Sequence, residues 1–259
     1  MQRQLALFED DVQMMPAIKA SRRGTFVDNM AMPIHRWFRY SAGFAAEWVE
    51  QVLTEWGIGR QHIVLDPFVG SGTVPVVCDT RGTRSLGVEA HPFVARICKG
   101  KLLWEVPPEQ VEDFAARVLV RAKKRESNTV SYPPLIKRSF DVDALASLDA
   151  MKHAWLDLQD ESPASELVWL AMTAILRPTS KAGTAQWQYI LPNKTKKRVT
   201  APFPALRQQI EMMKTDLQWM QARAGRSLAE IIPGDARTLS DNTAYEVDAV
   251  ITSPPYANN

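Results

Sequence analysis

Two short apolar runs along the chain each lead into a loop rich in glycine or proline. Residues 63–65 run into Asp66 and then into a turn with glycines at positions 70 and 72. Residues 249–251 run into a second loop that contains two consecutive prolines. A short apolar run bounded by such turn residues is typical of a buried strand. The pattern therefore predicts two strands, each opening into a loop at its carboxyl end.

The residues after the first loop predict a βαβ unit. Residues 73–78 continue as a short helix that Gly82 ends, and residues 85–89 form the next strand. Glu89 ends that strand at close to the roughly 20-residue spacing that dinucleotide folds use. An acid in this place can hydrogen-bond the two ribose hydroxyls of an adenosine. The alternative is an ordinary solvated acid at the end of a strand.

The middle of the chain has the apolar spacing of helices. In residues 107–124 apolar side chains recur at i, i+3, i+4, i+7 and i+8, which is the pattern of an amphipathic helix. Other helices are expected in the second half of residues 35–53, ending near Gly57, and at residues 92–103, 140–159, 163–176 and from Phe203 to an end at Gly225, with Tyr132-Pro133-Pro134 as a linker. Residues 231–235 and 247–253 then supply the last two strands. The order of elements predicts an α/β fold with a helical insertion.

Composition removes several classes of protein. The chain has 259 residues, 46% of them hydrophobic, and a formal net charge of +2, so any nucleic-acid contact must come from a local patch. Cys78 and Cys98 form no CxxC pair and the four histidines are scattered, which argues against a metal site or a disulfide framework. We find no apolar run of membrane-spanning length and no signal pattern, and expect a cytoplasmic protein.

The two loops together resemble two motifs of one enzyme family. Asp66-Pro67-Phe68-Val69-Gly70-Ser71-Gly72-Thr73 resembles motif I (DPFxGxGT), and Ser253-Pro254-Pro255-Tyr256 resembles motif IV (SPPY). Both belong to the amino-methyltransferases that use S-adenosylmethionine to methylate exocyclic nitrogens of DNA bases, of the N4-cytosine or N6-adenine type. Three further segments are similar to that family, at residues 34–40, 87–92 and 234–237.

The resemblance implies a fold, a cofactor and a set of cofactor-binding residues. The fold is the Rossmann-like sheet of class I methyltransferases, and the cofactor is S-adenosylmethionine. The implied cofactor-binding residues are Asp66, Pro67, Phe68, Gly70, Ser71, Gly72, Thr73, Glu89 and, on the adenine side, Asp235. His35, Arg36 or Tyr40 is expected near the methionine end of the cofactor. The alternative is that the aromatic residues of this segment pack in the core.

The same resemblance implies that Ser253, Pro254, Pro255 and Tyr256 are catalytic. The Ser253 side chain and the Pro254 carbonyl would accept hydrogen bonds from the target amine, and Tyr256 would stack on a base rotated out of the duplex. Ser at position 253, rather than Asp or Asn, slightly favours cytosine N4 over adenine N6. The alternative is a rigid structural turn.

One loop of the insertion combines aromatic and basic side chains. Trp187, Tyr189, Lys194, Lys196, Lys197 and Arg198 are the candidate nucleic-acid contacts of this loop. Lysine and arginine neutralise phosphates, and an aromatic ring can stack on an unpaired base. A solvated loop is the alternative.

The motifs divide the chain into four parts. Residues 1–32 are an N-terminal tail, 33–106 the cofactor-binding part, 107–229 the helical insertion and 230–259 the return to the sheet with the catalytic loop. The expected function is DNA base methylation in a restriction-modification or related prokaryotic system. The alternatives are an RNA base methyltransferase and a truncated fragment that binds S-adenosylmethionine or nucleic acid without turnover.

The resembled fold continues beyond its motif IV with further strands and helices, whereas this sequence stops at Asn259. We therefore expect a sheet that is incomplete in its C-terminal half and a chain that needs a complementing polypeptide for activity.

A short box near the N-terminus suggests another partner. Gln4-Leu5-Ala6-Leu7-Phe8 resembles the pentapeptide with which bacterial replication and repair proteins dock on the sliding clamp. The alternative is a tail that folds back and buries Leu5 and Phe8 on its own domain.

Overall fold

The structure is a computed structural model, and it describes residues 28–40, 43–183, 195–238 and 246–253. Its core element is a parallel sheet of four strands in the order β3-β2-β1-β4. The strands are β1 (Ile63–Asp66), β2 (Arg84–Glu89), β3 (Ala229–Pro233) and β4 (Ala249–Val250). The α/β class and the Rossmann-like sheet that the sequence predicts are confirmed.

β4 is shorter than the predicted strand at residues 247–253, but its backbone pairing with β1 extends at both ends. The Asp248 amide donates to the Ile63 carbonyl at 2.9 Å, and the Ile251 amide donates to the Leu65 carbonyl at 3.0 Å. Chain order reverses between these two strands, because β2 and β3 lie on one side of β1 and β4 on the other. This point of reversal is where open parallel sheets bind their ligands.

Three helices follow the predicted pattern around the sheet: α1 (Ala46–Glu55), α2 (Thr73–Arg81) and α3 (Pro92–Lys101). α1 and α2 share an apolar core with β1 and with the residues of the last strand, and Val49, Val64, Val74 and Ile251 are buried in it. Gly82 ends α2 in the left-handed conformation, as expected for a helix carboxyl end.

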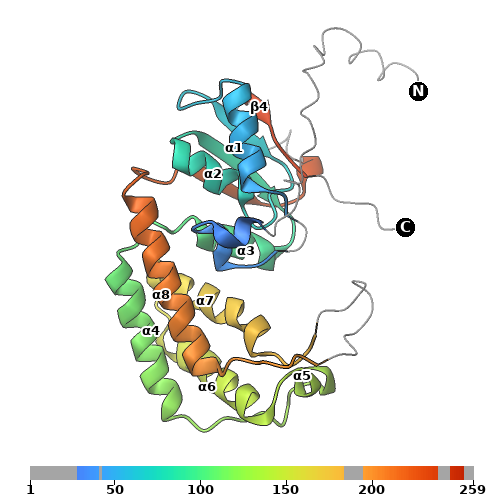
Figure 1. The fold of residues 1–259 in the computed structure, drawn as a ribbon, viewed down its shortest axis with the longest axis vertical. Coiled ribbons are helices and arrows are strands. Elements are labelled where there is room, and N and C mark those ends of the chain that lie inside the picture. The colour runs from blue at the N-terminus through green and yellow to red at the C-terminus, as the bar shows by residue number, and fades with distance from the viewer. Residues whose placement is uncertain (1–27, 41–42, 184–194, 239–245, 254–259) are drawn as a thin grey trace, which may run out of the picture.

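The insertion consists of α4 (Pro108–Lys123), α5 (Pro134–Ser139), α6 (Val142–Leu158), α7 (Pro163–Thr179) and α8 (Pro202–Gln221). Figure 1 shows α4, α6, α7 and α8 gathered in a layer beneath the sheet. The four long helices agree with the predicted ranges, and Ser162 caps α7 by accepting a hydrogen bond from the Ser165 amide at 3.2 Å. The expected linker at 132–134 needs a correction, because Pro134 begins the short helix α5, where proline fits the first turn.

The segment before α1 is part of the fold from residue 28 onward, earlier than the predicted end of the tail at residue 32. It contains two 3₁₀ turns, η1 (Asp28–Ala31) and η2 (His35–Trp37). Asn29 is fully buried, donates to the Phe44 carbonyl at 2.9 Å and accepts from the Ala46 amide at 2.7 Å. A buried asparagine with both functions paired anchors this segment against the start of α1.

Candidate cofactor and catalytic site

The two loops singled out in the sequence meet at one edge of the sheet. β1 and β4 are neighbouring parallel strands, so their carboxyl ends point to the same edge. Asp66 is the last residue of β1, and Thr252 and Ser253 come two and three residues after the end of β4. The structure therefore brings Asp66 close to Thr252, the residue before Ser253, although more than 180 positions of sequence separate them.

Asp66 is a buried acid whose carboxylate is only partly hydrogen-bonded. The residue is 1% exposed, and its Oδ1 atom accepts one hydrogen bond, from the Phe68 amide at 3.1 Å. Neither Asp66 Oδ2 nor the Thr252 hydroxyl oxygen has a well-formed hydrogen bond within the described residues. Burial raises the pKa of Asp66 to about 6, while the nearby Thr252 hydroxyl and the Phe68 amide oppose the rise. The site thus holds buried acceptor atoms that a ligand can use.

The loop after Asp66 has a backbone that favours glycine at two positions. Gly70 has φ 53° and Gly72 has φ 88°, both in the left-handed region. A Cβ atom at Gly72 would lie 2.8 Å from the Cys98 sulfur, and one at Gly70 would lie 3.1 Å from the Tyr40 ring. Ser71 between them is buried, and its hydroxyl has no hydrogen bond among the described residues. Thr73, also buried, begins α2, whereas Pro67 is half-buried and Phe68 is 41% exposed at the surface of the loop.

Glu89 ties the loops of β1 and β2 together. Its Oε2 accepts from the Gly70 amide at 3.1 Å, and its Oε1 accepts from the His91 amide at 2.8 Å. The residue is half-buried, so the carboxylate still faces solvent in part. A carboxylate has about four acceptor positions, and two backbone bonds leave room for ligand hydroxyls.

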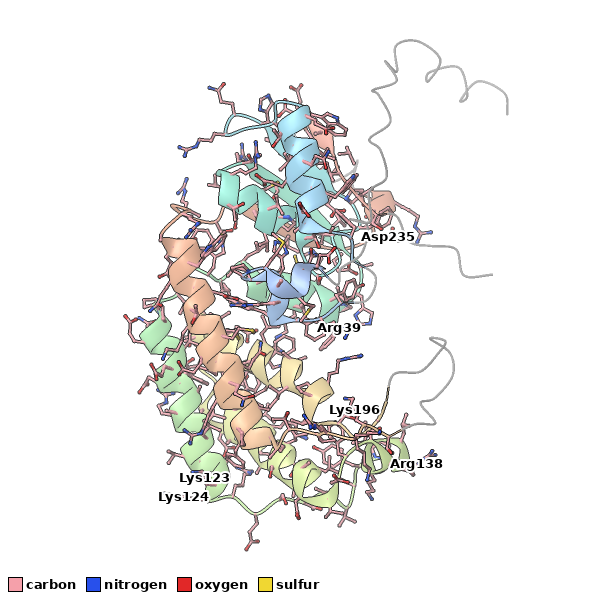
Figure 2. All side chains as sticks on the ribbon, in the orientation of Figure 1. Arg39, Lys123, Lys124, Arg138, Lys196 and Asp235 are labelled. Carbon is pink, nitrogen blue, oxygen red and sulfur yellow. The ribbon has the colours of Figure 1, made fainter. Side chains whose placement is uncertain are left out.

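Asp235 lies at the same edge, one strand further along. It follows β3 by two residues, and the neighbouring Gly234 amide donates to the Glu89 carbonyl at 3.1 Å. The Arg237 side chain bonds the Asp235 carboxylate at 2.5 Å and, with its backbone amide, lowers the pKa of Asp235 to about 2. Figure 2 shows Asp235 beside the sheet, on the side to which Arg39 also points. Its carboxylate is engaged with Arg237 in this state.

The three residues expected near the methionine end have different surroundings. Tyr40 packs on Gly70, as the glycine geometry shows. Arg36 instead pairs with Asp216 of α8, at 2.5 Å. His35 is 3% exposed, and burial together with the charge of Lys101 lowers its pKa to about 3. Of these three, Tyr40 is the one that lies against the candidate site.

Part of the predicted site lies outside the described residues. Pro254, Pro255 and Tyr256 of the catalytic loop belong to this group, as do Trp187, Tyr189 and Lys194 of the insertion. Ser253 is described and is half-buried at the sheet edge. Lys197 and Arg198 are exposed, while Lys196 donates to the carbonyls of Arg177 and Ser180. The Gln4–Phe8 box is also outside the described part of the chain.

Two features of the site were not identified from the sequence. Thr252 was passed over, although its place directly before Ser253 is a usable signal. The basic side chains Arg39 and Arg177 were also missed, because they are isolated in the sequence and only packing brings them near Lys196 and Arg198. Within the described ranges no three His, Cys, Asp or Glu side chains gather as metal ligands. No described helix is long and apolar enough to cross a membrane.

The comparisons with known proteins point to one class. The chain is similar to type II methyltransferases. It is 25% identical over 260 residues to the type II methyltransferase M.BsoBI of Geobacillus stearothermophilus, a match that covers 89% of this chain and 50% of that protein. It is 34% identical over 69 residues to the type II methyltransferases M.AvaI of Nostoc sp. and of Anabaena variabilis, covering 27% of this chain and 14% of each of those proteins. The chain thus spans about half the length of M.BsoBI, and its match to each M.AvaI protein covers a smaller share. No family model matches the chain. No solved structure matches it either.

Proposed function

We propose that this chain carries the S-adenosylmethionine site and the first catalytic residues of a DNA amino-methyltransferase. One observation carries the proposal: the loops after β1 and β4 meet at the reversal point of a parallel sheet in the order β3-β2-β1-β4. The similarity to type II methyltransferases supports the same function and favours a role in restriction-modification.

The residues at the sheet edge fit the cofactor. Asp66 Oδ2, the Ser71 hydroxyl and the Thr252 hydroxyl are buried polar atoms without a well-formed hydrogen bond among the described residues, and a polar ligand would satisfy them. Glycine at positions 70 and 72 lets the backbone come close to a ligand. Glu89 would hold the ribose hydroxyls, Asp235 would lie on the adenine side, and Pro67, Phe68 and Thr73 would complete the wall. When bound, the cofactor supplies an electrophilic methyl group on a sulfonium.

The proposed chemistry addresses the weak nucleophilicity of an exocyclic amine, whose lone pair is delocalised into the base. The Ser253 side chain and the Pro254 carbonyl accept hydrogen bonds from the amine and so localise the lone pair on nitrogen. Pro255 keeps the loop rigid, and Tyr256 stacks on the extruded base. This part rests on the sequence motif and on the position of Ser253 at the sheet edge. We favour cytosine N4 over adenine N6 as the target, because position 253 is serine.

The first test measures S-adenosylmethionine binding by calorimetry. Glu89→Ala should weaken binding by about 1–3 kcal/mol, which is about 5- to 150-fold, because a charged hydrogen bond to the ribose is lost. Glu126→Ala is the matched control, since Glu126 is an exposed acid in the insertion, and should leave the affinity unchanged. Unchanged affinity in a folded Glu89→Ala protein would remove Glu89 from the site, and no binding by the wild type would contradict the proposal.

The second test measures transfer of a tritiated methyl group to duplex DNA and to total RNA. It is run with the chain alone and with a polypeptide that supplies the remaining half of a methyltransferase domain. We expect transfer to DNA in the combined reaction and little with the chain alone. Preferential transfer to RNA would replace the proposed substrate. The complementing polypeptide and the sliding clamp stay predictions from the sequence.

A further inference from the structure

A cavity of about 700 Å³ lies between the η2 segment, the carboxyl end of α7 and residues 195–200. This volume is in the range of ligand-binding cavities. Five basic residues line it: Arg36, Arg39, Arg177, Lys196 and Arg198. Its described lining includes no aspartate or glutamate. Figure 2 shows Arg39 on the sheet side and Lys196 on the helical side of the same flank of the molecule. We refer to it as the basic cavity.

Most of the positive charge in the basic cavity is not neutralised by described residues. Arg36 is paired with the buried Asp216 of α8. Lys196 donates to the carbonyls of Arg177 and Ser180, which hold its ammonium in place but carry no charge. Arg39 and Arg198 are exposed and form no hydrogen bond or ion pair within the described part of the chain.

Two of the cations, Lys196 and Arg177, are close enough to affect one another. Burial lowers the pKa of Lys196, and the charge of Arg177 lowers it further. Like charges gathered in a partly desolvated place repel, and a bound anion removes that repulsion. The basic cavity is therefore arranged for an anionic ligand.

The basic cavity adjoins the candidate cofactor site. Arg39 directly precedes Tyr40, whose ring packs on Gly70 of the cofactor loop. Phe93, at the start of α3, also lines the cavity and comes four residues after Glu89. Its ring packs edge to face on Phe38, with the centroids 6.3 Å apart. The cavity therefore lies next to the segment that packs on the loop after β1.

We propose that the basic cavity binds the phosphate backbone of the duplex DNA whose base enters the methyl-transfer site, with Arg39 and Arg198 as phosphate contacts. This inference rests on the proposed function for its choice of ligand. The inference adds Arg39, which lies outside the aromatic and basic loop of the insertion, to the residues that contact DNA. Arg39 and Arg198 are far apart in the sequence but line the same cavity. Phosphate contacts position a duplex without reading its sequence, so the cavity sets the register of the DNA and leaves base selection to other residues.

The test compares two double variants of the full chain that change the net charge equally. Arg39→Glu with Arg198→Glu alters the basic cavity, and Lys123→Glu with Lys124→Glu alters two exposed cations at the end of α4, which Figure 2 places at the far end of the helical layer. Binding of a fluorescent duplex is followed by anisotropy across a range of salt concentrations, and S-adenosylmethionine binding is followed by calorimetry.

The cavity variant should bind duplex DNA at least about tenfold more weakly at low salt, and the salt slope of log K should fall by about 2, one for each lost phosphate contact. The α4 variant should change affinity less than about twofold and keep its slope. Arg39→Lys with Arg198→Lys should restore the slope, since a phosphate contact needs charge more than shape. Both glutamate variants should bind S-adenosylmethionine as the wild type does.

Equal losses in the two glutamate variants would overturn the inference, because the cavity would then act only through net charge. A wild type that binds S-adenosylmethionine but no duplex would also overturn it and would leave the cofactor proposal intact. If the wild type binds DNA with the expected dependence on Arg39 and Arg198 but no S-adenosylmethionine, the cavity is supported and the proposed function fails. A stronger dependence with RNA of equal length would overturn the choice of DNA.

Discussion

Asp216 in α8 and Asp66 at the end of β1 are both almost fully buried, yet the fold pairs one carboxylate and leaves the other short of partners. Asp216 accepts from the Ile34 amide at 3.1 Å, from Arg36 at 3.0 and 2.5 Å and from the Trp37 indole at 2.9 Å. Asp66 accepts one amide, and its second oxygen has no well-formed hydrogen bond among the described residues.

The difference separates an acid whose hydrogen bonds are complete within the fold from an acid that keeps an acceptor atom for the proposed ligand. Asp216 fixes the η2 segment on the helical layer. Asp79 of α2 does the same elsewhere, accepting from the Trp104 indole at 2.8 Å, the Ser227 hydroxyl at 2.6 Å and the Leu228 amide at 2.9 Å. Buried polar groups are normally paired. Among the described residues seven buried side-chain polar atoms have no well-formed hydrogen bond, and three of them, on Asp66, Ser71 and Thr252, belong to the loops after β1 and β4, whereas those on His35, Thr83, Ser85 and Ser165 lie elsewhere.

Removing the paired acid should have the largest effect. Asp216→Ala leaves the Arg36 guanidinium and the Trp37 indole without their acceptor, and should lower the free energy of unfolding by about 3–5 kcal/mol. Urea denaturation of the full chain measures the change. Glu126→Ala, an exposed acid, should stay within about 0.5 kcal/mol of the wild type. A decrease in the free energy of unfolding of less than about 1 kcal/mol for Asp216→Ala would show that these hydrogen bonds do not stabilise the fold.

Asp66→Asn should have the opposite sign in the ligand-free protein. A carboxyl whose pKa is about 6 in the folded state and 3.8 when unfolded contributes stability below pH 3.8 and loses it as the pH rises through 6. Above pH 7 the variant should therefore be more stable than the wild type, by about 3 kcal/mol as an upper estimate. Between pH 4 and pH 7 the free energy of unfolding of the wild type should fall relative to that of the variant. Urea denaturation of both proteins at several pH values measures this difference.

The same substitution should weaken S-adenosylmethionine binding, because the ionised carboxylate is the form that attracts a cationic ligand. Wild-type affinity should rise with pH through about 6, and the affinity of Asp66→Asn should be flat over that window. A variant that is less stable than the wild type at pH 7.5 would make Asp66 a structural acceptor like Asp216.

Two serine substitutions sharpen the comparison at a smaller scale. Ser227→Ala removes a hydroxyl that donates to the buried Asp79 carboxylate, and should cost about 1.5–3 kcal/mol of unfolding free energy. Ser71→Ala removes a buried hydroxyl without a hydrogen bond among the described residues, and should change stability by less than about 1 kcal/mol. Thermal unfolding of both variants at one pH gives the ranking. Equal losses would mean that the Ser71 hydroxyl has a structural partner after all.

Local pattern was enough to predict most of the elements. Apolar periodicity located α4, α6, α7 and α8, and turn residues located the ends of β1 and α2. The short helix α5 was missed, because two prolines indicate a linker as readily as a helix start. The structured residues before Met32 were missed too, since the burial of Asn29 comes from contacts with Phe44 and Ala46 rather than from any periodicity.

The sequence by itself determined the candidate motifs at 66–73, 89 and 253. A glycine turn after an apolar run and a polar residue at the end of a strand can be identified from local residue types alone. Only the tertiary structure decided which of these residues are neighbours, which acids are paired and where charge accumulates. Asp66 and Thr252 meet through the pairing of β1 with β4, and Arg39 approaches Arg198 through the packing of η2 against α7. Such contacts depend on long-range packing and desolvation, which leave no periodic signal along the chain.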